Sequence, residues 1–91
     1  MRIVIIGSGF GGLAAATRLQ AQGHEVVVVE KRDQPSGRAS VFRQRGFVFD
    51  AGPTIITAPA LLDELFALAG KQTRDAVCLV PLDPYYNVRF R

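Results

Sequence analysis

Hydrophobic residues form two short runs near the N-terminus of the chain, and an alanine-rich stretch separates them. The runs cover residues 3–6, within a first strand at 2–6, and residues 26–29. The unbroken run at 26–29 is typical of a parallel strand buried on both faces. Residues 11–22 carry apolar side chains at helical spacing, and Gly23 follows as an expected left-handed cap. The pattern therefore predicts a β-α-β unit with parallel strands.

A loop and a hairpin are expected after this unit. Residues 31–38 are polar and rich in turn formers, which predicts a loop. Two strand-like runs, at residues 41–45 and 47–50, are separated by Gly46, and this spacing is typical of a β-hairpin.

A second helix is predicted from Pro59, which suits a first helical position, to Gly70. Its cap position holds Ala58, a poor capping residue. Two further strands are expected at residues 77–80 and 86–91.

The turn between the first strand and the first helix carries a phosphate-binding pattern. Gly7, Gly9 and Gly12 occupy the three glycine positions of G-x-G-x-x-G. In that motif the first glycine permits a tight turn, the second leaves room for a pyrophosphate, and the third lets the helix approach the strands. The uncapped N-terminus of the helix then favours an anion. Together these features predict a dinucleotide site.

An acidic residue stands where a ribose ligand is expected. Glu30 ends the second strand, about 20 residues beyond the glycine loop. A carboxylate there accepts hydrogen bonds from ribose hydroxyls and repels a 2′-phosphate, although Lys31 and Arg32 weaken that repulsion. In the same loop, Arg38 either contacts a phosphate or is an exposed surface residue, and local chemistry does not distinguish the two.

Composition limits these interpretations. A chain of 91 residues holds one small domain and too few strands for a complete doubly wound sheet. We therefore expect residues 1–91 to form the N-terminal part of a larger dinucleotide-binding domain, or to complete their sheet with another chain. A net charge of +3, with basic and acidic residues interspersed, does not indicate nucleic-acid binding.

The remaining signals are modest. The single cysteine, Cys78, excludes an internal disulfide and is expected in a core or strand. The lone His24 indicates no metal site. Because no apolar stretch approaches the ~20 residues of a membrane span, we expect a cytoplasmic chain.

The sequence resembles the N-terminus of bacterial-type phytoene desaturases, which are flavin-dependent carotenoid desaturases of the flavin amine oxidase superfamily. The glycine loop and Glu30 carry part of the likeness. Gly37 with Arg38, residues 49–54 and residues 65–70 also resemble the family, and the match covers nearly the whole chain. The more discriminating part is Asp50 to Thr54 together with the second helix.

The resemblance implies FAD as the cofactor and an apolar carotenoid precursor as the substrate of the full-length enzyme, which would work peripherally at a membrane. It implies cofactor contacts from the glycine loop, the ribose acid, the Gly-Arg loop and a Gly-Pro-Thr turn near the flavin ring. The implied cofactor-binding residues are Gly7, Ser8, Gly9, Gly11, Gly12, Glu30, Lys31, Gly37, Arg38, Gly52, Pro53 and Thr54. It assigns no catalytic residue to this chain.

Two positions depart from the family pattern. Ser36 replaces the first glycine of a Gly-Gly pair, and this costs roughly 1 kcal/mol if the backbone there is left-handed. Ala58 replaces an aspartate cap. The expected fold is α/β: an incomplete Rossmann-like FAD-binding β-α-β unit, a hairpin, a second helix and two short strands.

The expected function is that of an oxidoreductase segment in carotenoid biosynthesis, inactive in isolation. Two alternatives stay open at the level of sequence. One is a related flavin amine oxidase or protoporphyrinogen oxidase, and the other is a noncatalytic dinucleotide-binding or interaction module.

Overall fold

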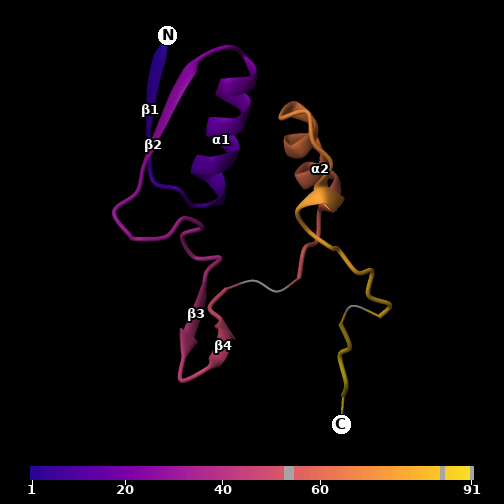
Figure 1. The fold of residues 1–91 in the computed structure, drawn as a ribbon. Coiled ribbons are helices and arrows are strands. Elements are labelled where there is room, and N and C mark those ends of the chain that lie inside the picture. The colour runs from indigo at the N-terminus through magenta and orange to yellow at the C-terminus, as the bar shows by residue number, and fades with distance from the viewer. Residues whose placement is uncertain (53–54, 85, 91) are drawn as a thin grey trace.

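A computed structural model describes residues 1–52, 55–84 and 86–90 of the chain. Its class is mixed α/β, as the sequence predicted (Figure 1). In chain order the elements are β1 (Arg2–Ile6), α1 (Phe10–Ala21), β2 (Glu25–Val29), β3 (Val41–Gln44), β4 (Phe47–Asp50), α2 (Pro59–Leu68) and the short 3-10 helix η1 (Thr73–Asp75).

The first three elements form the predicted β-α-β unit. Strands β1 and β2 are parallel, with Ile3 opposite Val26 and Ile5 opposite Val28. These four side chains are half-buried, and the γ-methyl of Ile5 lies close to the backbone of α1 at Gly12. The helix therefore covers this face of the two-stranded sheet.

The opposite face of the same sheet is open. Val4, Val27 and Val29 are exposed there, and Ile6 retains 89% of its accessible surface. Burial of both faces was predicted for residues 26–29 of β2, and this part of the prediction is wrong for the described residues. The physical reason is that α1 packs on one face, while α2 packs against α1 and not against the strands.

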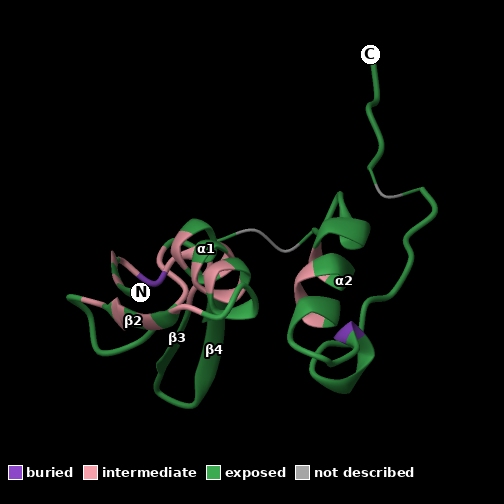
Figure 2. Ribbon diagram, turned by 90° about the horizontal axis from the view of Figure 1, so that it is seen from above, coloured by how far each residue is buried: buried purple, intermediate pink, exposed green. Residues whose placement is uncertain are grey.

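Helix α1 ends as expected, since Gly23 has a φ of +93° just beyond it. Helix α2 begins at Pro59, as predicted, and ends two residues before Gly70. The half-buried residues of α2 lie on its side toward α1 (Figure 2). An ion pair of 2.7 Å between Arg18 and Glu64 joins the two helices.

The predicted hairpin is present and exposed along its whole length. Strands β3 and β4 are antiparallel, and the rings of the opposed Phe42 and Phe49 stack with centroids 5.0 Å apart. The two turn residues, Arg45 and Gly46, have φ values of +52° and +82°. This geometry is typical of the two-residue turns that match strand twist, and it explains the need for glycine at one of the two positions.

The two predicted C-terminal strands are not formed. Residues 77–80 and 86–90 have no regular structure, and residue 91 lies outside the described part. A strand requires a hydrogen-bonding partner, and no described strand lies beside either segment. Cys78 is accordingly exposed rather than in a core.

A short 3-10 helix, η1, was not predicted. Thr73 at its start is buried, and its hydroxyl donates to the carboxylate of Asp63 on α2. Among the described residues only Thr73 and Ser8 are buried, and no hydrophobic side chain is.

Candidate dinucleotide site

The glycine loop is tied to the carboxyl ends of both strands. The N–H of Gly7 donates to the carbonyl oxygen of Val29 at 2.7 Å, which joins the end of β1 to the end of β2. Gly7 has a φ of +101°, a conformation that side chains disfavour. The predicted role of Gly7 in the tight turn agrees with this backbone geometry.

Gly12 allows α1 to lie close to the loop. A Cβ atom added to Gly12 would be only 2.1 Å from the carbonyl oxygen of Gly7. Gly9 differs, because a Cβ added there would meet nothing within 4 Å. Gly9 therefore borders open space that a ligand can fill, whereas Gly12 is packed within the protein.

The N-terminus of α1 is suited to an anion. Gly9 is the N-cap and has no side chain to pair with the first N–H groups of the helix, and no acidic residue lies in the first turn. These N–H groups have no partner within the helix itself. Together with the open space at Gly9, they can hold the phosphates of a dinucleotide.

Glu30 lies directly over this loop. Its Oε2 atom accepts hydrogen bonds from the N–H of Ser8 at 2.8 Å and from the Ser8 hydroxyl at 2.7 Å. Its Oε1 atom accepts from the N–H of Arg32 at 3.1 Å. Donation from the Ser8 N–H, then from the Ser8 hydroxyl and the Arg32 N–H, lowers the pKa of Glu30 to about 2. The carboxylate is therefore ionised at neutral pH.

The loop after β2 folds back onto the glycine loop. The N–H of Ser36 donates to the carbonyl oxygen of Ser8 at 2.8 Å. A Cβ added to Gly37 would lie 3.1 Å from the Cα of Gly9, and the Arg32 guanidinium donates to the Gly37 carbonyl oxygen at 3.0 Å. Segments about 28 residues apart in the sequence therefore touch through their backbones.

Ser36 has a φ of +92°. The sequence predicted that a serine would be strained here if the backbone were left-handed, and the backbone is left-handed. The strain is the consequence of a side chain at a position that favours glycine.

A third segment packs against the second. A Cβ added to Gly52 would be 2.2 Å from the carbonyl oxygen of Arg38, and the N–H of Ala51 donates to the Ser40 carbonyl oxygen at 2.8 Å. The glycine loop, the Gly37 turn and Gly52 thus form a continuous series of close backbone contacts. Pro53 and Thr54, also predicted for the site, lie outside the described residues.

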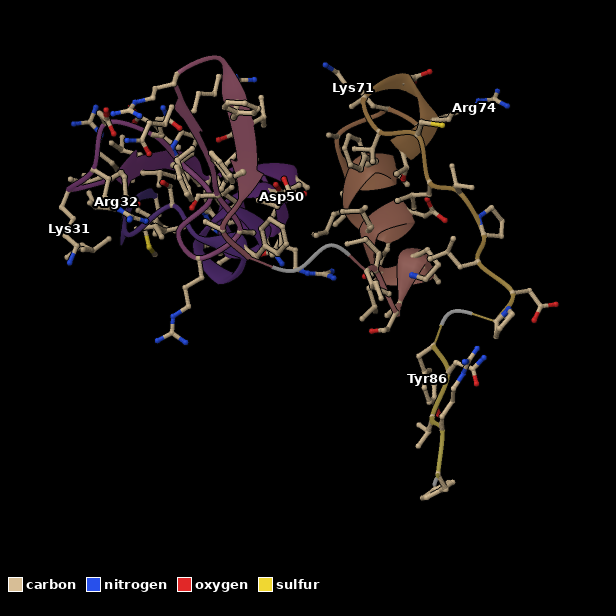
Figure 3. All side chains as sticks on the ribbon, turned by 90° about the horizontal axis from the view of Figure 1, so that it is seen from below. Lys31, Arg32, Asp50, Lys71, Arg74 and Tyr86 are labelled. Atoms are coloured by element: carbon tan, nitrogen blue, oxygen red, sulfur yellow. The ribbon has the colours of Figure 1, made fainter. Side chains whose placement is uncertain are left out.

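The other predicted residues are placed less centrally. Gly11 is exposed in the first turn of α1. Lys31 points outward, away from the β-α-β unit (Figure 3). Arg38 is exposed, and within the described part of the chain its guanidinium has no hydrogen bond or ion pair. It is therefore available to an anionic ligand.

Two contacts were missed at the level of sequence. Arg32 was considered only as a charge near the ribose position, but its guanidinium and its N–H both hold the loop together. Ser8 was predicted to bind a cofactor, but its polar groups bind Glu30 and Ser36. A hydroxyl inside a glycine loop was the available signal for Ser8, whereas nothing in the sequence identified the bond from Arg32 to Gly37.

A family model described as an NAD(P)-binding Rossmann-like domain matches residues 5–70. The chain belongs to this family. The matched segment contains the glycine loop, Glu30, the Gly37 turn and Gly52, and the family match agrees with the predicted Rossmann-like fold. The chain is accordingly a domain segment of the kind that binds a nucleotide cofactor.

Relatives of this Rossmann-like segment are phytoene desaturases. A lycopene-forming phytoene desaturase from Pantoea ananas is 57% identical over 92% of the chain. A neurosporene-forming phytoene desaturase from Rhodobacter capsulatus is 49% identical over 98% of the chain. The segment spans 17% of the length of each. The resemblance to phytoene desaturases is therefore confirmed for the N-terminal segment of such proteins.

Solved structures share the fold. The crystal structure of an oxidoreductase from Methanosarcina mazei matches 71% of the chain with a TM-score of 0.61 and 33% identity, and the match covers 17% of that protein. A Pyrococcus furiosus protein matches with a TM-score of 0.59. Among the described residues of the present chain, no helix is long and apolar enough to cross a membrane, and no group of three or more potential metal ligands occurs.

Proposed function

We propose that this chain is the N-terminal FAD-binding segment of a flavin-dependent phytoene or carotenoid desaturase. One observation carries the proposal: three segments pack together in a chain that is 57% identical to a phytoene desaturase. The segments are the glycine loop with Glu30, the Gly37 turn, and Gly52. When bound, FAD supplies the redox chemistry of the dehydrogenation, and the protein supplies binding and orientation.

Each segment has a proposed part in holding the cofactor. The N–H groups at the start of α1 bind the pyrophosphate beside Gly9, where the space is open. The ionised Glu30 accepts hydrogen bonds from the adenosine ribose. Arg38, whose guanidinium has no partner in the described part of the chain, adds a phosphate contact. Gly52, which packs against Arg38, is proposed to lie at the flavin end of the cofactor, as the resemblance implies.

FAD is favoured over a 2′-phosphorylated nicotinamide dinucleotide. The Glu30 carboxylate is held in the charged form and repels a 2′-phosphate. Arg32 keeps its positive charge while its guanidinium donates to the Gly37 carbonyl oxygen, so Arg32 and the exposed Lys31 reduce this repulsion without removing it.

The proposed substrate is an apolar carotenoid precursor. An apolar hollow of about 460 Å³, lined by residues 55–57, Pro59 and residues 79–82, follows the Gly52 turn along the chain. Its chemistry suits a hydrocarbon, and access to such a substrate favours peripheral association with a membrane.

The open face of the β1–β2 sheet supports the proposal that residues 1–91 are part of a larger FAD-binding domain. Val4, Ile6, Val27 and Val29 form an exposed apolar surface on a sheet with two strands. Apolar sheet faces require a covering layer. We infer that further chain of the same protein, or another chain, covers this face and completes the sheet, and that the isolated segment is inactive.

A chimera tests the proposed function. Residues 1–91 would replace the corresponding segment of the Pantoea ananas phytoene desaturase, and the purified chimera would be assayed for flavin absorbance and for desaturation of phytoene. Retained FAD with desaturation supports the proposal. Retained FAD with oxidation of amines or protoporphyrinogen, but not phytoene, would favour a related flavin oxidase. Failure to retain flavin would favour a noncatalytic module.

Glu25, at the start of β2, and Glu30, just after its end, provide a matched pair of variants. Glu30→Ala in the chimera should raise the Kd for FAD by about tenfold or more, since hydrogen bonds to a charged group are lost. Glu25→Ala removes the same side chain at the other end of the strand, where Glu25 pairs with Arg2 in solvent. It should leave the Kd unchanged. Equal Kd values for the two variants would count against the ribose role of Glu30.

A further inference from the structure

Ser8, whose side chain carries a single hydroxyl, links the glycine loop to Glu30 and to the loop at Ser36. It retains 4% of its accessible surface. Its N–H and its hydroxyl both donate to Oε2 of Glu30, at 2.8 and 2.7 Å. Its carbonyl oxygen accepts the N–H of Ser36 at 2.8 Å. All of the polar groups of this buried residue are therefore used inside the protein.

We propose that Ser8 is a positioning residue, which holds the Glu30 carboxylate in place for the adenosine ribose and does not itself contact the cofactor. This inference rests on the proposed function, because it assumes that Glu30 binds a dinucleotide. It changes the role of Ser8 from a cofactor ligand, as the sequence suggested, to a residue that acts through Glu30.

The distribution of hydrogen bonds on the carboxylate indicates which oxygen faces the ribose. A carboxylate offers about four acceptor positions, two on each oxygen. Ser8 occupies both positions on Oε2, and the Arg32 N–H occupies one on Oε1. The Lys31 N–H adds a further, weaker contact to the carboxylate, so the capacity left for a ribose hydroxyl is on Oε1, the oxygen that Ser8 does not hold. This oxygen can accept a hydrogen bond from a ribose hydroxyl, but an anionic 2′-phosphate has no proton to donate to it.

The same serine also sets the position of the second loop. Because the Ser8 carbonyl binds Ser36, the neighbouring Gly37 turn lies against Gly9. The ribose acid and the Gly37–Arg38 segment are thereby fixed relative to one glycine loop. A cofactor that meets both segments encounters groups already held in place, which reduces the entropy lost on binding.

Removal of one hydroxyl tests this role in the chimera described above, which supplies the rest of the FAD-binding domain. Ser8→Ala keeps the N–H and the carbonyl of residue 8 and deletes only the bond from the hydroxyl. Thr17→Ala is the matched control, because its hydroxyl binds the Leu13 carbonyl oxygen within α1, at 2.9 Å. Circular dichroism would establish that both variants fold, and Ser8→Cys, of similar size but a weaker donor, provides a second variant.

Two measurements distinguish positioning from a general structural effect. NMR titration of the Glu30 side-chain carboxyl should show a higher pKa in Ser8→Ala, an intermediate pKa in Ser8→Cys, and no change in Thr17→Ala. Fluorescence titration with FAD should show a Kd raised by about two- to tenfold in Ser8→Ala, the effect of one hydrogen bond. In a Glu30→Ala background, Ser8→Ala should leave the Kd for FAD unchanged.

The possible failures are distinguishable. An unchanged Glu30 pKa in Ser8→Ala would overturn the role of Ser8 alone. An equal loss of FAD affinity with and without Glu30 would also overturn it, because Ser8 would then contact the cofactor directly. Absence of FAD binding by the unsubstituted chimera would overturn the proposed function, and with it the assignment of the held carboxylate to a ribose.

Discussion

Substitution of Gly12 by alanine should separate the packing role of the glycine loop from its role in ligand binding. The added Cβ would lie 2.1 Å from the carbonyl oxygen of Gly7 and 3.1 Å from its carbonyl carbon. Ordinary contacts of a Cβ begin near 3.4 Å. Both atoms it meets are backbone, so no side chain can rotate away, and α1 must shift from the loop by roughly 1 Å to relieve the overlap.

The expected loss of stability follows from two opposed effects. Overpacking against a rigid backbone costs about 1–3 kcal/mol. Alanine in a helix is favoured over glycine by about 0.5–1 kcal/mol, which offsets part of that cost. We therefore expect Gly12→Ala to lower the free energy of unfolding by about 1–2 kcal/mol.

Neighbouring glycines supply the controls. A Cβ on Gly11 would meet nothing within 4 Å, so Gly11→Ala should gain about 0.5–1 kcal/mol from helix propensity alone. A Cβ on Gly9 also meets nothing, but it would enter the space proposed for the pyrophosphate. Gly9→Ala should therefore change the free energy of unfolding by less than about 1 kcal/mol and still abolish FAD binding.

Chemical denaturation followed by circular dichroism, and FAD titration followed by fluorescence, would measure these effects on the same protein samples. Equal free energies of unfolding for Gly12→Ala and Gly11→Ala would refute the packing argument. Unaltered FAD affinity in Gly9→Ala would refute the placement of the phosphates.

Three further substitutions or conditions test local features. The pKa of Glu30 is lowered from 4.5 to about 2 in the folded chain. The stability that the Glu30 carboxylate contributes is therefore present above pH 4.5 and is lost as the pH falls toward 2. The unfolding midpoint of the unsubstituted chain should decrease across this pH window, and that of Glu30→Gln should decrease less. Ser36→Gly should raise the free energy of unfolding by about 1 kcal/mol, because glycine accepts the φ of +92° without strain, whereas Ser40→Gly should not raise it. Ala58→Asp should add about 0.5–2 kcal/mol in denaturation experiments, since α2 has no side-chain cap; an unchanged midpoint would show that the α2 N-terminus is not limiting.

The order of the elements could be predicted from the sequence because each depends on neighbouring residues. Apolar runs identified β1 and β2, helical spacing identified α1, and Gly46 identified the hairpin turn. The position of Glu30 at the end of β2 also followed from counting along the chain. Helix boundaries differed by one or two residues, because terminal turns depend on cap geometry.

The prediction of two C-terminal strands was wrong for a reason that no local sequence pattern reveals. Residues 77–80 have strand-like composition, but strand formation depends on a partner, and no described strand lies beside them. The one-sided cover of the β1–β2 sheet has a similar origin. An apolar run indicates which residues are suited to burial, and only the packing of α1 and α2 decides which of them are covered.

The sequence by itself determined the β-α-β unit, the glycine loop and the acid expected at the ribose, since these follow from periodicity and from spacing along one segment. Only the tertiary structure decided that Ser8 binds Glu30 and Ser36, and that Gly52 lies against Arg38. The physical reason is that these contacts join residues far apart in the chain. Their distances depend on how the loops close, and loop closure is set by the backbone contacts of Gly9, Gly37 and Gly52 together.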